Sequence, residues 1–160
     1  MLNLQGVGFN VSSIKKEGKT QLTVFTFGLP NEYNETFELT NESVINAEVE
    51  DLNSDGSPEL VVFTQNEGDQ SHGNIYAFSV NNQKSMSQVY FQPTEENKQI
   101  SSGYNGNDQF ALVETYLVQR FPIYENGVDT KKIRQIQYEL IDGEASRRFV
   151  VKSQTEFDAQ

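Results

Sequence analysis

The sequence predicts an all-β fold, a single antiparallel β-sandwich domain over residues 1–160 with about nine or ten short strands. Short runs of β-branched and aromatic residues recur along the whole chain, and several alternate apolar with polar positions. Turn-forming residues separate these runs. No stretch has the apolar periodicity of an amphipathic helix of three turns, and no linker or repeat divides the chain.

The first strands are predicted near the N-terminus. In the run Phe9–Ile14, residues 9, 11 and 13 are expected on one face of a strand and residues 10, 12 and 14 on the other. The polar segment Lys15–Lys19 after them, which contains Gly18, is expected to form a hairpin turn. Residues Leu22–Phe27 are mostly β-branched and aromatic, and the segment Gly28–Asn31 ends the run. The pattern indicates a β-hairpin.

The middle of the chain combines one half-buried strand with one that is buried on both faces. Apolar residues at 45, 47 and 49 alternate with polar ones, so only one face of this strand is expected in the core. Residues Leu60–Phe63 are wholly apolar, which is typical of a central strand. Residues Gly73–Val80 and Met86–Phe91 flank a short hairpin loop at Asn81–Lys84.

The C-terminal part continues the pattern. An apolar run is expected over Phe110–Phe121, and Pro122 marks a strand end or an edge because proline cannot donate to a sheet. Residues Ile136–Leu140 alternate cleanly, and a turn at Asp142 and Gly143 leads toward Phe149–Val151.

The chain of 160 residues is strongly acidic, with 23 Asp and Glu against 12 Lys and Arg and a net charge of −11. This charge repels phosphate backbones and anionic lipids, so binding to nucleic acid or to a membrane surface is disfavoured, no nucleic-acid partner is expected and a basic protein is favoured. No apolar run is long enough for a membrane span. The absence of cysteine excludes disulfides, thiol catalysis and zinc–thiolate sites.

The sequence predicts no enzymatic activity and no catalytic residue. The single histidine, His72, lies in a polar loop, and no nucleophile-elbow motif accompanies it. No spacing singles out a pair of carboxylates for glycoside hydrolysis, and no glycine-rich phosphate loop precedes a helix.

The segment from Asp51 to Glu59 has the character of a calcium loop, although no cofactor is required. Alternating oxygen ligands around a glycine suit a hard cation. The candidate ligands are Asp51, Asn53, Asp55, Ser57 and Glu59. Val62 stands where a helix-loop-helix calcium site needs glutamate, so the resemblance is to the short loops of integrin-type propeller repeats. The alternative is an Asx-rich turn in which these side chains bond to the local backbone.

The segment from Ser101 to Asp108 is the candidate partner-binding loop. Two glycines, Gly103 and Gly106, flank Tyr104, and the other residues are small and polar. In one interpretation, Tyr104 and Ser101 or Ser102 enter a partner's cleft, since tyrosine is a favoured anchor. In the other interpretation, the tyrosine folds down onto the sandwich.

Four runs together resemble the bacterial periplasmic inhibitors of invertebrate-type lysozyme. They are residues 47–60, 103–110, 117–124 and 134–140. The resemblance implies a β-sandwich whose loop plugs the substrate cleft of lysozyme, a basic glycoside hydrolase. It implies that Ser101 (or Ser102) and Tyr104 insert, that Gly103 and Gly106 shape the loop, and that the strand at Arg120, Phe121 and Pro122 lies beneath as scaffold.

The resemblance also implies a periplasmic or exported protein, although the first residues lack the features of a signal peptide. Two alternatives remain open from the sequence. One is a calcium-binding cell-surface or adhesion module, and the other is a relative of the inhibitors that binds a different glycan or protein.

Overall fold

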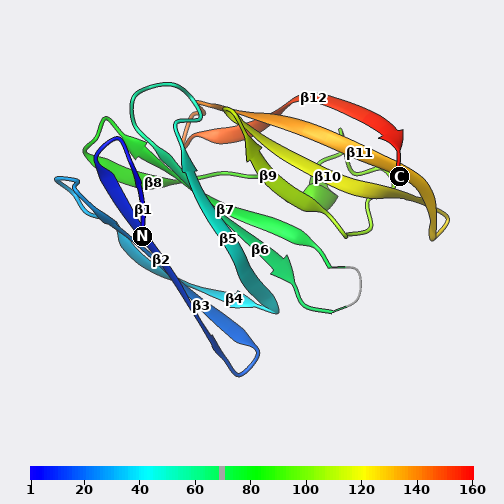
Figure 1. Ribbon diagram of the computed structural model, residues 1–160, viewed down its shortest axis with the longest axis horizontal. Helices are drawn as coiled ribbons and strands as arrows, with labels where there is room; N and C mark the ends of the chain where they lie inside the picture. The colour runs from blue at the N-terminus through cyan, green and yellow to red at the C-terminus, as the bar shows by residue number, and fades with distance from the viewer. Residues whose placement is uncertain (69–70) are drawn as a thin grey trace.

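The computed structural model, which describes residues 1–68 and 71–160, consists of three four-stranded antiparallel sheets (Figure 1). The prediction of an all-β, antiparallel fold is confirmed. The described residues form twelve strands, more than the nine or ten expected. One reason is that the run Phe110–Phe121 contains a turn, at which Glu114 takes a φ of +56° and divides the run into two strands.

Each sheet is formed by four strands consecutive in sequence. The first contains β1 (Leu2–Leu4), β2 (Val7–Lys16), β3 (Lys19–Phe27) and β4 (Asn34–Thr40). The second contains β5 (Glu42–Glu50), β6 (Glu59–Asn66), β7 (Gly73–Asn81) and β8 (Ser85–Val89). The third contains β9 (Gln109–Val113), β10 (Tyr116–Glu125), β11 (Val128–Ile141) and β12 (Arg148–Asp158).

The second sheet lies between the other two and contributes to two hydrophobic cores. Alternate side chains of β6 point to opposite faces. Leu60 and Val62 pack against the first sheet with Phe9 and Leu22, whereas Val61 and Phe63 belong to the core shared with the third sheet. Burial on both faces explains why this run is wholly apolar.

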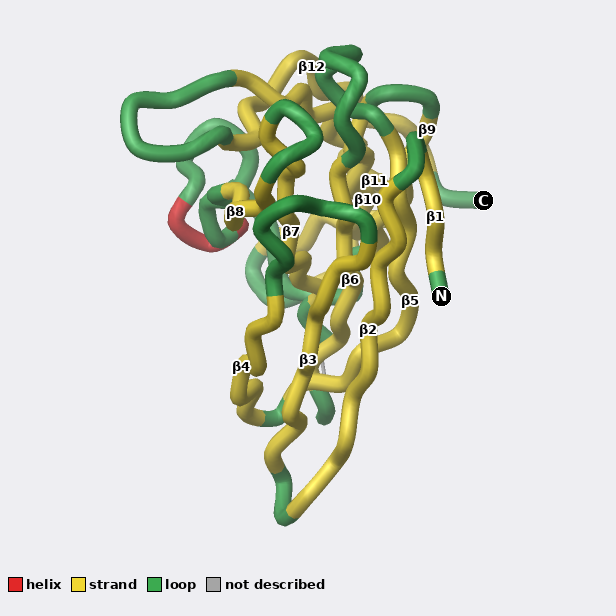
Figure 2. Tube along the Cα trace, turned by 90° about the vertical axis from the view of Figure 1, so that its left-hand side faces the viewer, coloured by secondary structure: helices red, strands yellow, loops and turns green. Residues whose placement is uncertain are grey.

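The candidate loop follows the connection from the second sheet to the third. After β8, Tyr90 pairs with Arg148 at the start of β12, and the chain then forms a short 3-10 turn, η1 (Thr94–Glu96). Figure 2 shows this turn on the same side of the molecule as β4 and β8. Residues 101–108 then lead into β9. Within the described part of the chain, no helix is long and apolar enough to cross a membrane.

Candidate functional site

The loop from Ser101 to Asp108 lies along β10 and is bonded to its backbone. Tyr104 forms an isolated antiparallel bridge with Ile123, and the amide of Tyr124 donates to the carbonyl of Gly103 at 2.8 Å. The amide of Asn107 donates to the carbonyl of Ser71 at 2.7 Å, which ties the loop to the second sheet as well. Segments distant in sequence therefore fix the course of this loop.

Tyr104 folds down onto the sheet, as the second interpretation of the sequence had it. Its ring packs edge-on against Phe121 with centroids 4.9 Å apart, and His72 lies 5.3 Å away on another side. Its hydroxyl donates to Asp108 Oδ1 at 3.0 Å. Burial, together with the nearby Asp108 carboxylate, raises the pKa of Tyr104 above its usual range. The phenol is therefore a neutral donor, and the residue as a whole is partly exposed.

Asp108 holds the end of the loop from the inside. It is 2% exposed and accepts hydrogen bonds from the Gly73 amide (2.6 Å), the Tyr104 hydroxyl (3.0 Å) and Gln119 Nε2 (2.9 Å). Gln119 is itself buried and accepts from the Tyr138 hydroxyl. Burial raises the pKa of Asp108, although the three hydrogen bonds oppose the shift. Asp108, predicted as part of the partner-binding set, thus acts as an internal support of the loop.

Arg134 clamps the start of the loop and was not singled out from the sequence. Its Nη1 donates to the carbonyls of Ile100 and Ser102, at 2.7 and 2.5 Å, and Nη2 pairs with Glu156 at 2.8 Å. The side chain is only 9% exposed. Arg134 lies two residues before Ile136 on β11, so both side chains are on the face of the strand that is buried in the core. An arginine at such a position is the feature of the sequence that could have identified it.

Gly103 is required by the geometry of the loop. Its φ is +80°, and a Cβ there would lie 2.7 Å from Ile123 Cγ2 and 2.8 Å from the carbonyl oxygen of Tyr124. Gly106 also has a positive φ, of +76°, and is buried. Both glycines shape the loop, as the resemblance implied.

The loop presents a small neutral surface to solvent. Ser102 and Asn107 are exposed, and Ser101, Tyr104 and Asn105 are partly exposed. Asn107 Nδ2 also donates to the Tyr124 hydroxyl at 3.3 Å. The outward face of the loop therefore offers hydroxyl and amide groups and no formal charge.

The expectation that Arg120, Phe121 and Pro122 lie beneath the loop holds for Phe121 alone. Phe121 is buried and touches Tyr104, whereas Arg120 is exposed and Pro122 partly so. Because side chains alternate along β10, the two neighbours of Phe121 point to the outer face of the third sheet.

The segment Asp51–Glu59 forms an Asx-rich turn. The Asp51 carboxylate accepts from the amides of Asp55 (3.2 Å) and Gly56 (2.9 Å), and Asp55 Oδ1 accepts from Ser57 (2.9 Å). Asn53 is partly buried, and its Oδ1 has no hydrogen-bond partner among the described residues. Across residues 1–68 and 71–160, no group of three His, Asp or Glu side chains is placed to hold a metal ion. The calcium site stays a prediction, which a thermal-shift titration with millimolar calcium tests.

Glu59 is buried in this segment. Its carboxylate accepts from the Leu52 amide at 2.7 Å and from the Ser79 hydroxyl at 2.6 Å, and the side chain is fully buried. Burial raises the pKa of Glu59 to about 7, and the charges of Asp55 and Asp51 add to the rise against the two hydrogen bonds. The native state thus holds this proton more tightly than the unfolded chain does.

The stability of the protein is therefore expected to fall as the pH rises through the pKa of Glu59. A raised native pKa stabilises the fold below the unfolded value near 4.5, and that contribution is lost by the time the pH has passed about 7. The shift corresponds to up to about 3 kcal/mol. Urea unfolding from pH 5 to 8 should show wild type losing stability relative to Glu59→Gln, which mimics the protonated acid. Equal pH profiles for the two proteins would contradict the prediction.

Comparison with known protein families, with curated proteins and with solved structures finds no match to this chain. The fold and the geometry of the loop, with the resemblance of the four runs, are therefore the basis for a proposal about function.

Proposed function

We propose that this protein is a non-enzymatic inhibitor of lysozyme, of the invertebrate type, that binds the enzyme's substrate cleft through the loop Ser101–Asp108. The observation that carries the proposal is the bracing of this loop. Arg134 fixes its first carbonyls and Asp108 fixes its end, so the backbone is held before any partner arrives. A preorganised loop loses little conformational entropy on binding, which favours affinity.

The chemistry of the loop fits a glycosidase cleft. Such clefts contain two catalytic carboxylates. Ser102 and Asn107 offer exposed neutral groups, and Tyr104 is partly exposed beside them. Hydroxyl and amide donors can approach carboxylates without charge repulsion, whereas acidic side chains there would oppose binding.

The distribution of charge supports a basic partner. Residues 20–83 contain eleven Asp and Glu and no Lys or Arg, so they carry the entire net charge of −11. The described part of this segment runs from β3 to β7, in the first two sheets. A basic enzyme would be attracted by this charge, and salt would slow the encounter. An exported location follows from the same proposal.

A cell-wall lysis assay tests the function. We expect near-stoichiometric protein to inhibit an invertebrate-type lysozyme, with chicken-type and goose-type enzymes assayed beside it. Ser102→Arg should weaken the inhibition because it places a long cation on the exposed face of the loop. Ser12→Arg, at another exposed serine, on β2, and with the same change of charge, serves as the control. Failure to inhibit any of the three enzymes would overturn the proposal.

A further inference from the structure

A groove of about 320 Å³ lies beside the candidate loop, on the outer face of the third sheet. Its wall includes Asn107 from the loop itself, so the groove is continuous with the proposed binding face. The other principal lining side chains are Gln109, Arg120, Pro122, Ile133 and Phe157.

The floor of the groove is a row of apolar side chains from three neighbouring strands. Pro122 of β10 is directly opposite Ile133 of β11, and Ile133 is directly opposite Phe157 of β12. Phe157 is 41% exposed. Side chains at paired positions share one face of a sheet, so the three form a continuous apolar strip at the surface.

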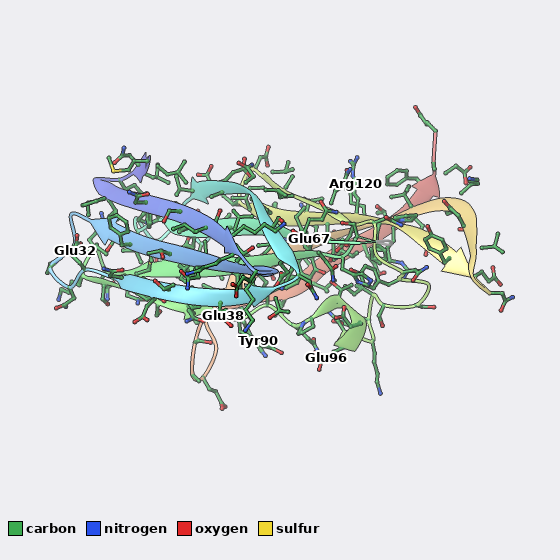
Figure 3. The ribbon with its side chains drawn as sticks, turned by 90° about the horizontal axis from the view of Figure 1, so that it is seen from below. Glu32, Glu38, Glu67, Tyr90, Glu96 and Arg120 are labelled. Carbon is green, nitrogen blue, oxygen red and sulfur yellow. The ribbon has the colours of Figure 1, made fainter. Side chains whose placement is uncertain are left out.

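Arg120 lies next to this strip. Its guanidinium is held in position by neighbouring side chains but has no counter-ion among the described residues. Its guanidinium carbon lies 5.6 Å from the centroid of the Phe157 ring, and its Nε donates to Gln135 Oε1 at 2.6 Å. Among the described residues, its two Nη groups have no hydrogen-bond acceptor, and no carboxylate lies within ion-pair distance. In Figure 3, Arg120 is on the opposite side of the molecule from Tyr90 and Glu96.

The surroundings preserve the positive character of this arginine. The next cross-strand row on the same face is Gln109, Arg120, Gln135 and Thr155, in which the arginine is the only charged residue. A guanidinium that lies over an aromatic ring and whose Nη groups have no acceptor among the described residues is suited to bidentate binding of a carboxylate. Although the protein carries a net charge of −11, this local positive group is expected to prefer a carboxylate as its ligand.

We infer that this groove is a second part of the binding face, in which Arg120 pairs with a carboxylate at the rim of the partner's cleft while apolar atoms of the partner cover the strip from Pro122 to Phe157. The inference rests on the proposed function and identifies the chemistry of the partner's surface there. Basic partners are attracted by residues 20–83, and the carboxylates that line a glycosidase cleft complement Arg120. The groove thus favours an enzyme that carries both features over a partner that is merely basic.

The test is the affinity of Arg120→Gln for an invertebrate-type lysozyme, measured by titration calorimetry. We expect a dissociation constant at least tenfold higher than that of wild type. Arg120→Lys should recover only part of the loss, because lysine lacks the planar fork. Arg148→Gln is the matched control, since Arg148 is exposed, lacks an ion pair among the described residues and lies at the other end of the third sheet. It should change the constant less than twofold.

The carboxylate is tested with lysozyme variants in which the cleft carboxylates are changed to amides one at a time. The effect of Arg120→Gln should disappear against one of them. If it persists against all of them, or if Arg120→Gln binds as tightly as Arg148→Gln, the inference is overturned while the inhibitor function stands. If wild type binds no lysozyme, the proposed function fails and the inference fails with it. Because Arg120 and Arg148 are exposed, each variant of these two residues should have a melting temperature within a few degrees of wild type. A change in affinity then reports on binding and not on folding.

Discussion

Replacing Asp108 by alanine is expected to destabilise the protein by about 3 to 5 kcal/mol. The carboxylate is buried and accepts three hydrogen bonds, from the Gly73 amide, the Tyr104 hydroxyl and Gln119. Alanine leaves the Gly73 amide and the Tyr104 hydroxyl without their acceptor, and Gln119 Nε2 keeps only its hydrogen bond to Thr94. An unpaired buried donor costs about 1 to 3 kcal/mol.

The measurement is the free energy of unfolding in urea, with Asp158→Ala as the control for loss of an exposed acid. The loss of stability for Asp108→Asn should be intermediate. One side-chain oxygen remains to accept hydrogen bonds, while the new amide group lies opposite one of the three hydrogen-bond donors. A loss of less than about 1 kcal/mol for Asp108→Ala, within the range of ordinary surface substitutions, would show that Asp108 does not brace the loop.

Replacing Tyr104 by alanine is expected to weaken binding to lysozyme by at least about 2 kcal/mol, or roughly thirtyfold in the dissociation constant. Two effects contribute. The partly exposed side chain is removed from the binding face, and the loop loses its packing on Phe121 and its hydrogen bond to Asp108. The second effect also lowers stability, because a half-buried ring leaves a cavity.

Tyr104→Phe separates the two contributions. The ring and its contact with Phe121 remain, while the hydroxyl donated to Asp108 is lost, at a cost of about 1 kcal/mol of stability. If the ring is the anchor, Tyr104→Phe should bind nearly as wild type does. Both variants binding with the wild-type constant would exclude Tyr104 from the interface.

Much of the fold was predictable because side chains alternate between the two faces of a strand, and the apolar residues of the sequence follow this alternation. The apolar run Leu60–Phe63 indicated a strand buried on both faces, and β6 occupies that place in the middle sheet. The strand β4 escaped prediction because five of its seven residues, Asn34–Thr40, are polar, and only Phe37 and Leu39 supply an apolar alternation. It is an edge strand, where burial imposes little on the sequence.

The candidate loop was recognisable from the sequence, but the course of its side chains was not. Glycines on both sides of Tyr104 are compatible with a projecting tyrosine and with one that folds down. The direction of the Tyr104 side chain depends on Asp108, which accepts a hydrogen bond from its hydroxyl, and on Phe121, which packs against its ring. Asp108 in turn is held by Gly73, which is 35 residues away in sequence. Contacts over such separations leave no local pattern. The place of Arg134 on the core face of β11 was readable from the sequence, but its partners Ile100 and Ser102, 34 and 32 residues away, were not.

Hydrogen exchange of the amides in residues 101–108, measured with and without an invertebrate-type lysozyme, tests the central claim most directly. We expect slower exchange at the exposed loop residues in the complex, with the buried core amides unchanged. Complex formation with unchanged exchange in the loop, and protection confined to another face, would contradict the claim that this loop enters the cleft.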